Sequence, residues 1–412
     1  MSTAPLRLPA FRRLLGSYAV SQLGDWAAEV ALAVLVYALT ESPVAVAVTW
    51  LVHRCLLGLA APLLVTRLER HRPQRLLPAL ALSQAAIFAA LALSAGRAGL
   101  AGILVLVAAD GLIAPVSRAL VRSTIAAVTR PAGLLAEGNA AINVAFTTNA
   151  MLAAAVGGIL TATLGAPAAL AFNALTFLAV AALLGAGPLP RNAGPDAADD
   201  HERTAVAALA DAVAYVRRQR PLGLMLGAYT AFTVFAMAIT PVEVVLVRGT
   251  LHAGSAALGV VLGAWGVGMI VGGALVGRLQ RRVGLATLLI GAAIAEAAAF
   301  LGMGLSAGVA EVAAFAALGG VGNGLEGVLF MTAVQERVSD AYQARVSGLV
   351  EALMTTAIGV GFLAGGTIAA LAGARATYVA AGAGGLAVIA WTLTRLRPRA
   401  AQRPARAALV TA

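Results

Sequence analysis

The chain has 412 residues, of which 60% are hydrophobic and only 11% are charged, and its mean hydropathy is +0.90. Soluble globular proteins carry about 25% charged residues, so this composition excludes a soluble protein and indicates a polytopic helical membrane protein. The net charge of +11 is carried by arginine, because the sequence contains no lysine. The single cysteine, Cys55, excludes a disulfide framework and a cysteine-based metal site.

Apolar segments recur along the chain, each near the ~20 residues that a membrane-spanning helix needs. The first is too long for a signal peptide and has no clear cleavage site, so we expect an uncleaved first span. The sequence therefore predicts an all-α polytopic membrane protein with twelve transmembrane helices. They lie at approximately 13–39, 43–66, 75–95, 98–118, 134–162, 167–187, 221–247, 255–277, 284–305, 309–333, 345–371 and 375–395.

The longest segment between two spans, 188–220, divides the chain. It opens with glycine, proline and acidic residues and then places apolar residues at helical spacing. We predict a flexible linker followed by an amphipathic helix on the inner membrane surface. The predicted organisation is an N-terminal six-helix half (1–187), this cytoplasmic linker, a C-terminal six-helix half (221–396) and a basic cytoplasmic tail (397–412).

The arginines decide the expected orientation. With the N-terminus inside, only Arg97, Arg248 and Arg375 fall in outer loops, Arg54 falls within a span, and the other arginines lie in inner segments. This asymmetry predicts that both termini are cytoplasmic. It also accounts for the positive charge without a nucleic-acid partner. The absence of lysine from an Ala-, Gly- and Arg-rich chain is typical of a GC-rich bacterial gene, so we expect the bacterial plasma (inner) membrane.

The two halves share a sequence repeat. Gly157-Gly158 and Gly165-Ala166 recur 208 residues later as Gly365-Gly366 and Gly373-Ala374. Two six-span halves in parallel orientation are one known plan for transporters, with the substrate path between the halves.

The first span carries two carboxylates, Asp25 and Glu29, one helical turn apart on one face. Asp25 lies roughly 16 Å along the helix from Leu14, close to the bilayer midplane. Burial there costs at least ~2.5 kcal/mol, which a partner charge, a water-filled cavity or a substrate must offset. Such a pair can hold one proton and exchange it with either side. Alternatively, Asp25 is a fixed ion-pair partner and Glu29 lies near the wetter outer end.

Arg54 is the only arginine within the core of a span, and it needs a partner. Asp25 is our first choice and Asp110, in the fourth span, our second. Pairing with Asp25 would leave Glu29 or Asp110 as the proton carrier. The ion pair acts either as a gate or as a permanent structural bridge, and we expect His53 to satisfy a helix contact.

Other polar residues within the spans either line a cavity or form hydrogen bonds between helices. The carboxylate among them is Glu326, and the substrate-cavity candidates are Gln22, Asn143, Thr147 and Asn323. The sequence has no P-loop, no metal-ligand spacing and no catalytic triad placed in an aqueous site. We therefore expect no cofactor, no metal and no catalytic residue, with a proton gradient as the energy source.

Four motifs, spread over nearly the whole chain, carry a family resemblance. They are Phe11-Arg12-Arg13-Leu14-Leu15 followed by Ser21-Gln22-Leu23-Gly24-Asp25-Trp26, then Leu68-Glu69-Arg70 with Arg75, then Gly272-Gly273-Ala274-Leu275-Val276-Gly277-Arg278, and finally Gly322-Asn323-Gly324-Leu325. With them, the chain resembles the major facilitator superfamily, and within it the branch of enterobactin exporters and macrolide efflux proteins, the transmembrane secretion effectors.

The resemblance implies that Glu69 and Arg70, with Gly273 and Arg278 in the second half, form a cytoplasmic gate motif. It also implies a central cavity built from helices 1, 2, 4, 5, 7, 8, 10 and 11, which makes Glu296 in helix 9 a weaker candidate. The chain departs from the family in helix 5, where only Gly157-Gly158 remains of the antiporter signature.

We therefore expect a secondary active transporter, not an enzyme, that exports a hydrophobic or amphipathic small molecule by proton-coupled alternating access. An antibiotic, a natural product or a siderophore would fit. The expected partners are the lipid bilayer and the small-molecule substrate, and we expect a monomer. Two alternatives stay open: an uptake symporter or facilitator of the same fold, and a non-transporting membrane sensor or assembly protein.

Overall fold

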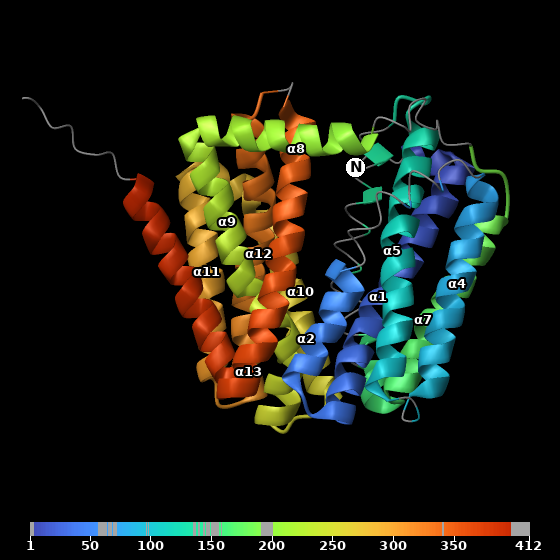
Figure 1. Cartoon of the computed structure of the whole chain (residues 1–412), viewed down its shortest axis with the longest axis horizontal. Coiled ribbons are helices and arrows are strands. Elements are labelled where there is room, and N and C mark those ends of the chain that lie inside the picture. The colour runs from blue at the N-terminus through green and yellow to red at the C-terminus, as the bar shows by residue number, and fades with distance from the viewer. Residues whose placement is uncertain are drawn as a thin grey trace, which may run out of the picture.

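The computed structural model describes residues 4–56, 72–95, 99–134, 159–190, 201–339 and 342–396, with a few positions between them: 64, 68, 97, 137, 138, 141, 142, 145, 149, 156 and 157. These residues are almost entirely helical and include no strand, which confirms the predicted all-α fold (Figure 1). Within this part of the chain, nine helices are long and apolar enough to cross a membrane. Three of the twelve predicted spans lie partly outside the described residues: 43–66, 134–162 and, by its first residue, 98–118.

The N-terminal half begins with a short 3-10 helix, η1 (Ala4–Arg7). Several of its helices have proline in their first turn, where the missing N–H removes no hydrogen bond of the helix. Ser42 caps the second helix, because its Oγ accepts a hydrogen bond from the Ala45 N–H at 3.3 Å. The helices are α1 (Pro9–Thr40), α2 (Pro43–Leu51), the π-helix η2 (Val52–Leu56), α4 (Pro73–Ser94), α5 (Leu100–Thr129) and α7 (Ala166–Gly185).

The C-terminal half differs from the prediction in two places. The predicted span 221–247 is interrupted after residue 238, because Pro241 cannot continue an α-helix. The last two predicted spans form one kinked element, α13. The elements are α8 (His201–Arg218), α9 (Arg220–Ala238), η4 (Thr240–Val242), η5 (Val245–Thr250), α10 (Ser255–Val283), α11 (Leu285–Leu305), α12 (Val309–Arg337) and α13 (Gln343–Leu396).

Two glycines related by the sequence repeat share an unusual backbone conformation. Gly165, before α7, has φ 85° and ψ 166°, and Gly373, within α13, has φ 88° and ψ 166°. This region of backbone space is essentially limited to glycine. Gly157 packs against Ala27 of α1, and Gly365 packs against Ala238 of α9 in the same manner. The repeat therefore marks equivalent turns and equivalent helix contacts, while the domain boundaries stay a prediction.

Small residues allow the helices of the C-terminal half to approach closely. Any side chain at Gly320 or Gly324 of α12 would collide with the carbonyl oxygens of Trp265 or Met269 in α10. Close approach of this kind replaces the hydrophobic drive for helix association that is missing in lipid. The glycine-rich run 320–324 is thus a packing surface rather than a nucleotide-binding loop.

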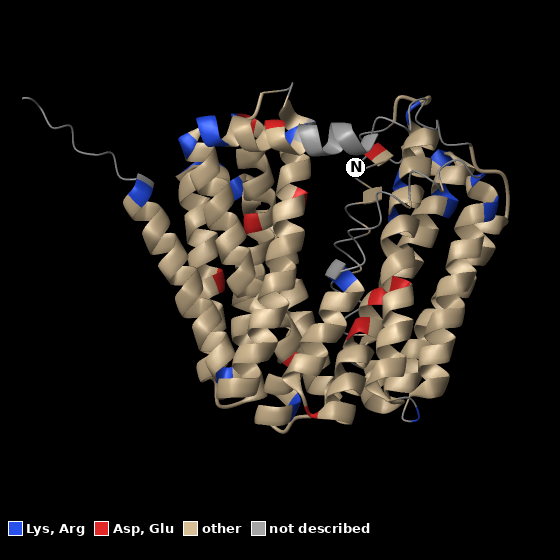
Figure 2. Ribbon diagram, in the orientation of Figure 1, with Lys and Arg blue, Asp and Glu red and all other residues tan. Residues whose placement is uncertain are grey.

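The halves meet at one end of the molecule, where α2 packs against α13 and η4 (Figure 1). Trp50 of α2 and Phe362 of α13 have ring centroids 6.0 Å apart. The start of α1 and the end of α13 lie at the opposite end, where α8 crosses the C-terminal half (Figure 1). Most of the described arginines gather at that same end (Figure 2).

Helix α8 is attached to the C-terminal half by its apolar side. Ala212 and Val216 are buried in a cluster with residues of α9, α12 and α13. The Tyr215 hydroxyl accepts a hydrogen bond from the Ser339 N–H at 3.1 Å, and Asp211 lies 3.5 Å from Arg345. The predicted amphipathic helix therefore directs its apolar face to protein in the described part of the chain.

Candidate functional site

A cavity of about 300 Å³ lies between the two halves, and we call it the central cavity. This volume is near the lower limit of the volumes of small-molecule binding sites. Such sites bury most of the surface of a drug-sized ligand. Its lining is mainly apolar and aromatic, with a few ionisable side chains. The aromatic residues are Trp26, Trp50, Trp265, Phe300 and Phe362, and the ionisable ones are Glu29, Arg54, Glu243 and Glu296.

The N-terminal wall of the central cavity contains one ion pair. Arg54 of η2 donates to the Glu29 carboxylate of α1. The guanidinium carbon of Arg54 also lies 5.4 Å from the ring centroids of both Trp26 and Trp50. The Arg54 side chain is 39% exposed and that of Glu29 10% exposed, so the cation faces the cavity and the anion lies behind it. A ligand in the cavity would meet the guanidinium first.

The prediction that Arg54 pairs with Asp25, or else with Asp110, is wrong. Helices α1 and α2 form an antiparallel hairpin joined by Glu41 and Ser42. Glu29 is twelve residues before Glu41 and Arg54 twelve after Ser42, so they lie at the same height. Asp25 lies four residues, or about 6 Å, further along α1. The length of the connection therefore selects Glu29.

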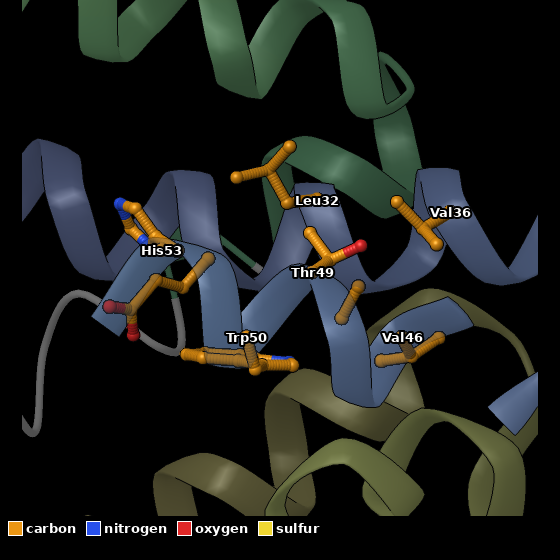
Figure 3. A pocket seen from close by; sticks show the side chains of 8 residues that line it. Leu32, Val36, Val46, Thr49, Trp50 and His53 are labelled. Atoms are coloured by element: carbon orange, nitrogen blue, oxygen red, sulfur yellow. The ribbon is translucent and has the colours of Figure 1, made fainter. Parts of the chain in front are cut away.

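The contact between α1 and α2 is tight beside this ion pair. Leu32 and Val36 of α1 face Val46, Thr49 and Trp50 of α2, with His53 beyond them (Figure 3). The space that they enclose is only about 10 Å³, roughly the volume needed for one water molecule. It has no room for a ligand.

Asp110 belongs to a separate buried network. Its Oδ1 accepts from Gln84 Nε2 at 2.9 Å, and its Oδ2 lies 2.9 Å from His53 Nε2. Asp110 is only 1% exposed. Gln84 is ten residues before the end of α4 and Asp110 ten residues after the start of α5, which again places partners of a hairpin at one height. His53 thus satisfies a helix contact, as expected, and joins η2 to α5.

Asp25 lies on the side of α1 that faces α7 rather than the central cavity. Its carboxylate oxygens accept from Ser21 Oγ and Asn173 Nδ2, each at 3.4 Å. Beside it, Gly24 packs directly against Asn173 and Thr176 of α7. Asp25 therefore has neutral polar neighbours and no ion-pair partner among the described residues.

Two buried acids of the C-terminal half lie close together across the α11–α12 interface. The carboxyl groups of Glu296 and Glu326 interact, and both side chains are buried. Asn323 Nδ2 donates to Glu296 Oε1 at 3.5 Å. Glu296 and Asn323 line the central cavity, as does Glu243 from the break between η4 and η5. Glu296 therefore lines the central cavity, although the family resemblance made it a weaker candidate for a cavity residue.

The remaining predicted site residues are dispersed. Gln22 is buried within the N-terminal half. Gly273 lies in α10 with Gly324 as its nearest neighbour, and Arg278 is exposed at the end of α10, with no ion pair among the described residues. Glu69, Arg70, Asn143 and Thr147 lie outside the described residues.

Sequence reasoning missed four polar residues near these sites: Gln84, Asn173, Glu243 and the cavity-facing Trp50. Gln84 and Asn173 are isolated polar residues in apolar spans, a signal that was present in the sequence. Glu243 follows Pro241 closely, so the sequence suggests the end of a span rather than a cavity wall.

The comparisons with known proteins agree with this fold. A family model described as transmembrane secretion effector matches residues 1–409. No curated protein matches the chain.

Solved structures of transporters are similar in fold over nearly the whole chain. The nucleoside transporter NupG matches with a TM-score of 0.71 and 13% identity, covering 94% of this chain and 100% of that one. The POT family transporter PepTSo matches with a TM-score of 0.72 and 10% identity, covering 94% and 97%. A bacterial homologue of the iron transporter ferroportin, in an inward-facing state, matches with a TM-score of 0.70 and 15% identity, covering 95% and 100%.

Proposed function

Because the chain belongs to the transmembrane secretion effector family of the major facilitator superfamily, we propose that it exports a hydrophobic or amphipathic small molecule by proton-coupled alternating access. The family makes it a multi-pass membrane protein and a transporter of the major facilitator type, which supports a transport role rather than an enzymatic one. The direction of transport, its energy source and the class of cargo are what we propose.

The observation that carries the proposal is the central cavity between the halves. Its wall combines aromatic rings from both halves with three carboxyl groups and one guanidinium. Apolar surface binds the body of an amphipathic cargo, and the few polar groups orient it. A carboxyl group that faces such a cavity can exchange a proton with water there, which couples cargo and proton at one site. An antibiotic, a natural product or a siderophore is a cargo of suitable chemistry.

The arginine distribution supports an orientation in which α8 and both chain ends are cytoplasmic. In that orientation the α2–α13 contact closes the outer end of the molecule. The arrangement then corresponds to an inward-facing state, open to cargo from the cytoplasm. We propose the bacterial plasma membrane as the location and a monomer as the working unit, with the bilayer and the cargo as its partners.

The proposed cycle uses residues of this chain in a defined order. Cargo enters between the aromatic residues and displaces a proton held by a cavity carboxyl group. The α2–α13 contact opens while the cytoplasmic ends close. Cargo leaves to the outside, and a proton from the outside replaces it and resets the cavity. The Glu29–Arg54 pair acts as the gate in this scheme, because an anionic or polar group of the cargo competes for the guanidinium that Glu29 otherwise holds.

Inverted membrane vesicles test the proposal. Ethidium is a suitable probe because it is an amphipathic cation with a large aromatic ring system, and its fluorescence reports its accumulation. When the vesicle interior is acidified, the full chain is expected to concentrate ethidium inside, and collapse of the proton gradient is expected to release it. Trp265→Ala, which removes an aromatic wall of the central cavity, should reduce the accumulation. Vesicles with the chain that behave as vesicles without it would refute export of this probe.

Uptake by the same fold is the second candidate, and one observation favours it. The helix 5 antiporter signature is reduced to Gly157-Gly158. An uptake symporter would concentrate probe in right-side-out vesicles under an inward proton gradient, whereas an exporter would not. A facilitator would only equilibrate the probe. A sensor or assembly protein would move none, and deletion of residues 397–412 would then alter signalling without altering transport.

A further inference from the structure

A second cavity, of about 170 Å³, lies within the C-terminal half, and we call it the side pocket. It is bordered by α9, α11, α12 and the last part of α13. Its polar side chains are Tyr229, Glu326, Arg337 and Thr392, and the others are apolar or alanine. Its volume is sufficient for several water molecules.

The Glu296–Glu326 pair stands between the two cavities. Glu296 lines the central cavity and Glu326 lines the side pocket. Each residue lines only its own cavity, and their carboxyl groups interact through the wall formed by α11 and α12. A group that passes between these carboxyl groups therefore passes from one cavity to the other.

Close helix packing holds the two carboxyl groups in place. A side chain at Gly322 of α12 would lie 2.6 Å from the Ala292 carbonyl oxygen and 3.0 Å from the Glu296 nitrogen of α11. Gly322 thus lets α12 approach α11 closely beside Glu296. Asn323 adds a donor to Glu296 Oε1, and Glu296 Oε2 has no donor as its partner.

None of the ion pairs among the described residues includes Glu296 or Glu326. The nearest titratable group from α9 is Tyr229, and α12 itself supplies the neutral Asn323. Helices α10 and α13 contribute apolar residues and Thr392 to the two cavities in this half. Across the central cavity, Arg54 is already paired with Glu29, and Glu243 adds a further acid.

Two neighbouring carboxylates in this setting repel one another, and neither can donate a hydrogen bond to the other. One shared proton removes one charge and supplies the donor that Glu296 Oε2 lacks. The side pocket then offers the proton a way out. It follows α12 from Glu326 to Arg337, eleven residues or about 16 Å away, and ends near Ser339, which is bound to α8.

We propose that the Glu296–Glu326 pair binds one proton between the two cavities and passes it from the central cavity to the side pocket. In the transfer, the O–H bond of Glu296 breaks as the O–H bond of Glu326 forms, and water in the side pocket takes the proton from Glu326. The inference deepens the proposed proton-coupled export. It gives the proton an exit to the α8 end that does not pass through the cargo in the central cavity.

Infrared spectroscopy of the purified full chain tests the proton site without any cargo. At neutral pH we expect a protonated-carboxyl C=O band that is lost in both Glu296→Gln and Glu326→Gln, because the glutamine N–H supplies the donor in place of the proton. The double variant should lose no more than either single variant, since the two residues share one proton. A band that persists in a single variant, or losses that add in the double variant, would overturn the proposal.

The exit route has its own test, with a matched control on the same helix. Ala286 lines the side pocket and is exposed, whereas Ala298 is also exposed on α11 but lines neither cavity. We expect Ala286→Phe to slow hydrogen–deuterium exchange of the carboxyl band several-fold and Ala298→Phe to leave it unchanged. Equal exchange rates in the two variants would overturn the route.

The infrared measurements require no transport. A negative infrared result can therefore be distinguished from a failure of the proposed export function. If inverted vesicles show no proton-driven ethidium accumulation while the shared band is present, export of ethidium is refuted and the proton site stands. If accumulation is present and the shared band is absent, the proton is carried elsewhere.

Discussion

The Glu29–Arg54 pair gives a quantitative prediction for stability. Breaking a fully buried ion pair costs about 3–5 kcal/mol, whereas exposed pairs contribute about 0.2–1 kcal/mol. The Glu29 side chain is 10% exposed but that of Arg54 is 39% exposed, so the pair lies between these limits. We expect a coupling free energy of about 1–2 kcal/mol after the discount for solvent around the guanidinium.

A double-mutant cycle measures this coupling. Glu29→Gln, Arg54→Gln and the double variant are compared by the free energy of unfolding in SDS titrations followed by circular dichroism. The cycle cancels what each substitution does on its own, including the loss of the Trp26 and Trp50 contacts of Arg54.

The chain offers a matched control at its surface. Asp211 and Arg345 lie 3.5 Å apart with side chains 60% and 44% exposed, so their coupling should stay below ~0.5 kcal/mol. A Glu29–Arg54 coupling no larger than the Asp211–Arg345 coupling would refute the reasoning. So would a cycle in which Asp25→Asn couples to Arg54 more strongly than Glu29→Gln does.

Three further substitutions have expected outcomes. Asp110→Ala leaves Gln84 and His53 without their common acceptor and should lower the free energy of unfolding by about 1–3 kcal/mol in the same titration, whereas an unchanged value would show that the network does not stabilise the fold. Gly373→Ala should cost about 1–3 kcal/mol because φ is 88°, while Gly348→Ala, in a helical stretch with open space beside it, should cost nothing; equal effects would contradict the backbone argument. Tyr215→Phe removes the acceptor of the Ser339 N–H and should speed its amide hydrogen exchange several-fold, whereas Tyr342→Phe, which keeps the ring stacked on Tyr215, should leave the rate unchanged.

The fold followed from the sequence because hydropathy and length alone specify membrane-spanning helices. Breaks within the spans were harder to predict. Pro241 interrupts the seventh predicted span, yet its apolar neighbours continue the hydropathy signal to residue 247. Similarly, the turn of α2 into a π-helix at Val52 places His53 and Arg54 toward different partners, and no local sequence signal marks it.

Most residues of the candidate site were predicted from the sequence, but the partner of each residue was not. A lone arginine in a span requires a carboxylate, and that requirement was met. Asp25 was the predicted partner of Arg54, whereas the two-residue connection between α1 and α2 decides which residues face one another. The same register argument, applied to α4 and α5, brings together Gln84 and Asp110.

Glu296 and Glu243 show a different reason for failure. The family resemblance implies that the helix of Glu296 lies outside the central cavity. In the structure, α11 packs on α12 closely enough to bring the Glu296 carboxyl group to this cavity. Glu243 reaches the cavity only because the helix breaks at Pro241. Both placements depend on tertiary packing that spacing along one helix does not encode.

Coupled movement of cargo and protons tests the central claim most directly. Liposomes that contain the full chain and a pH-sensitive dye are given an ethidium gradient, with no pH gradient and with the membrane potential clamped. Proton-coupled export predicts that ethidium leaving the lumen drives protons into it, so the lumen acidifies, and that Trp265→Ala weakens this response. Ethidium movement without any change in luminal pH would contradict the account and identify a facilitator.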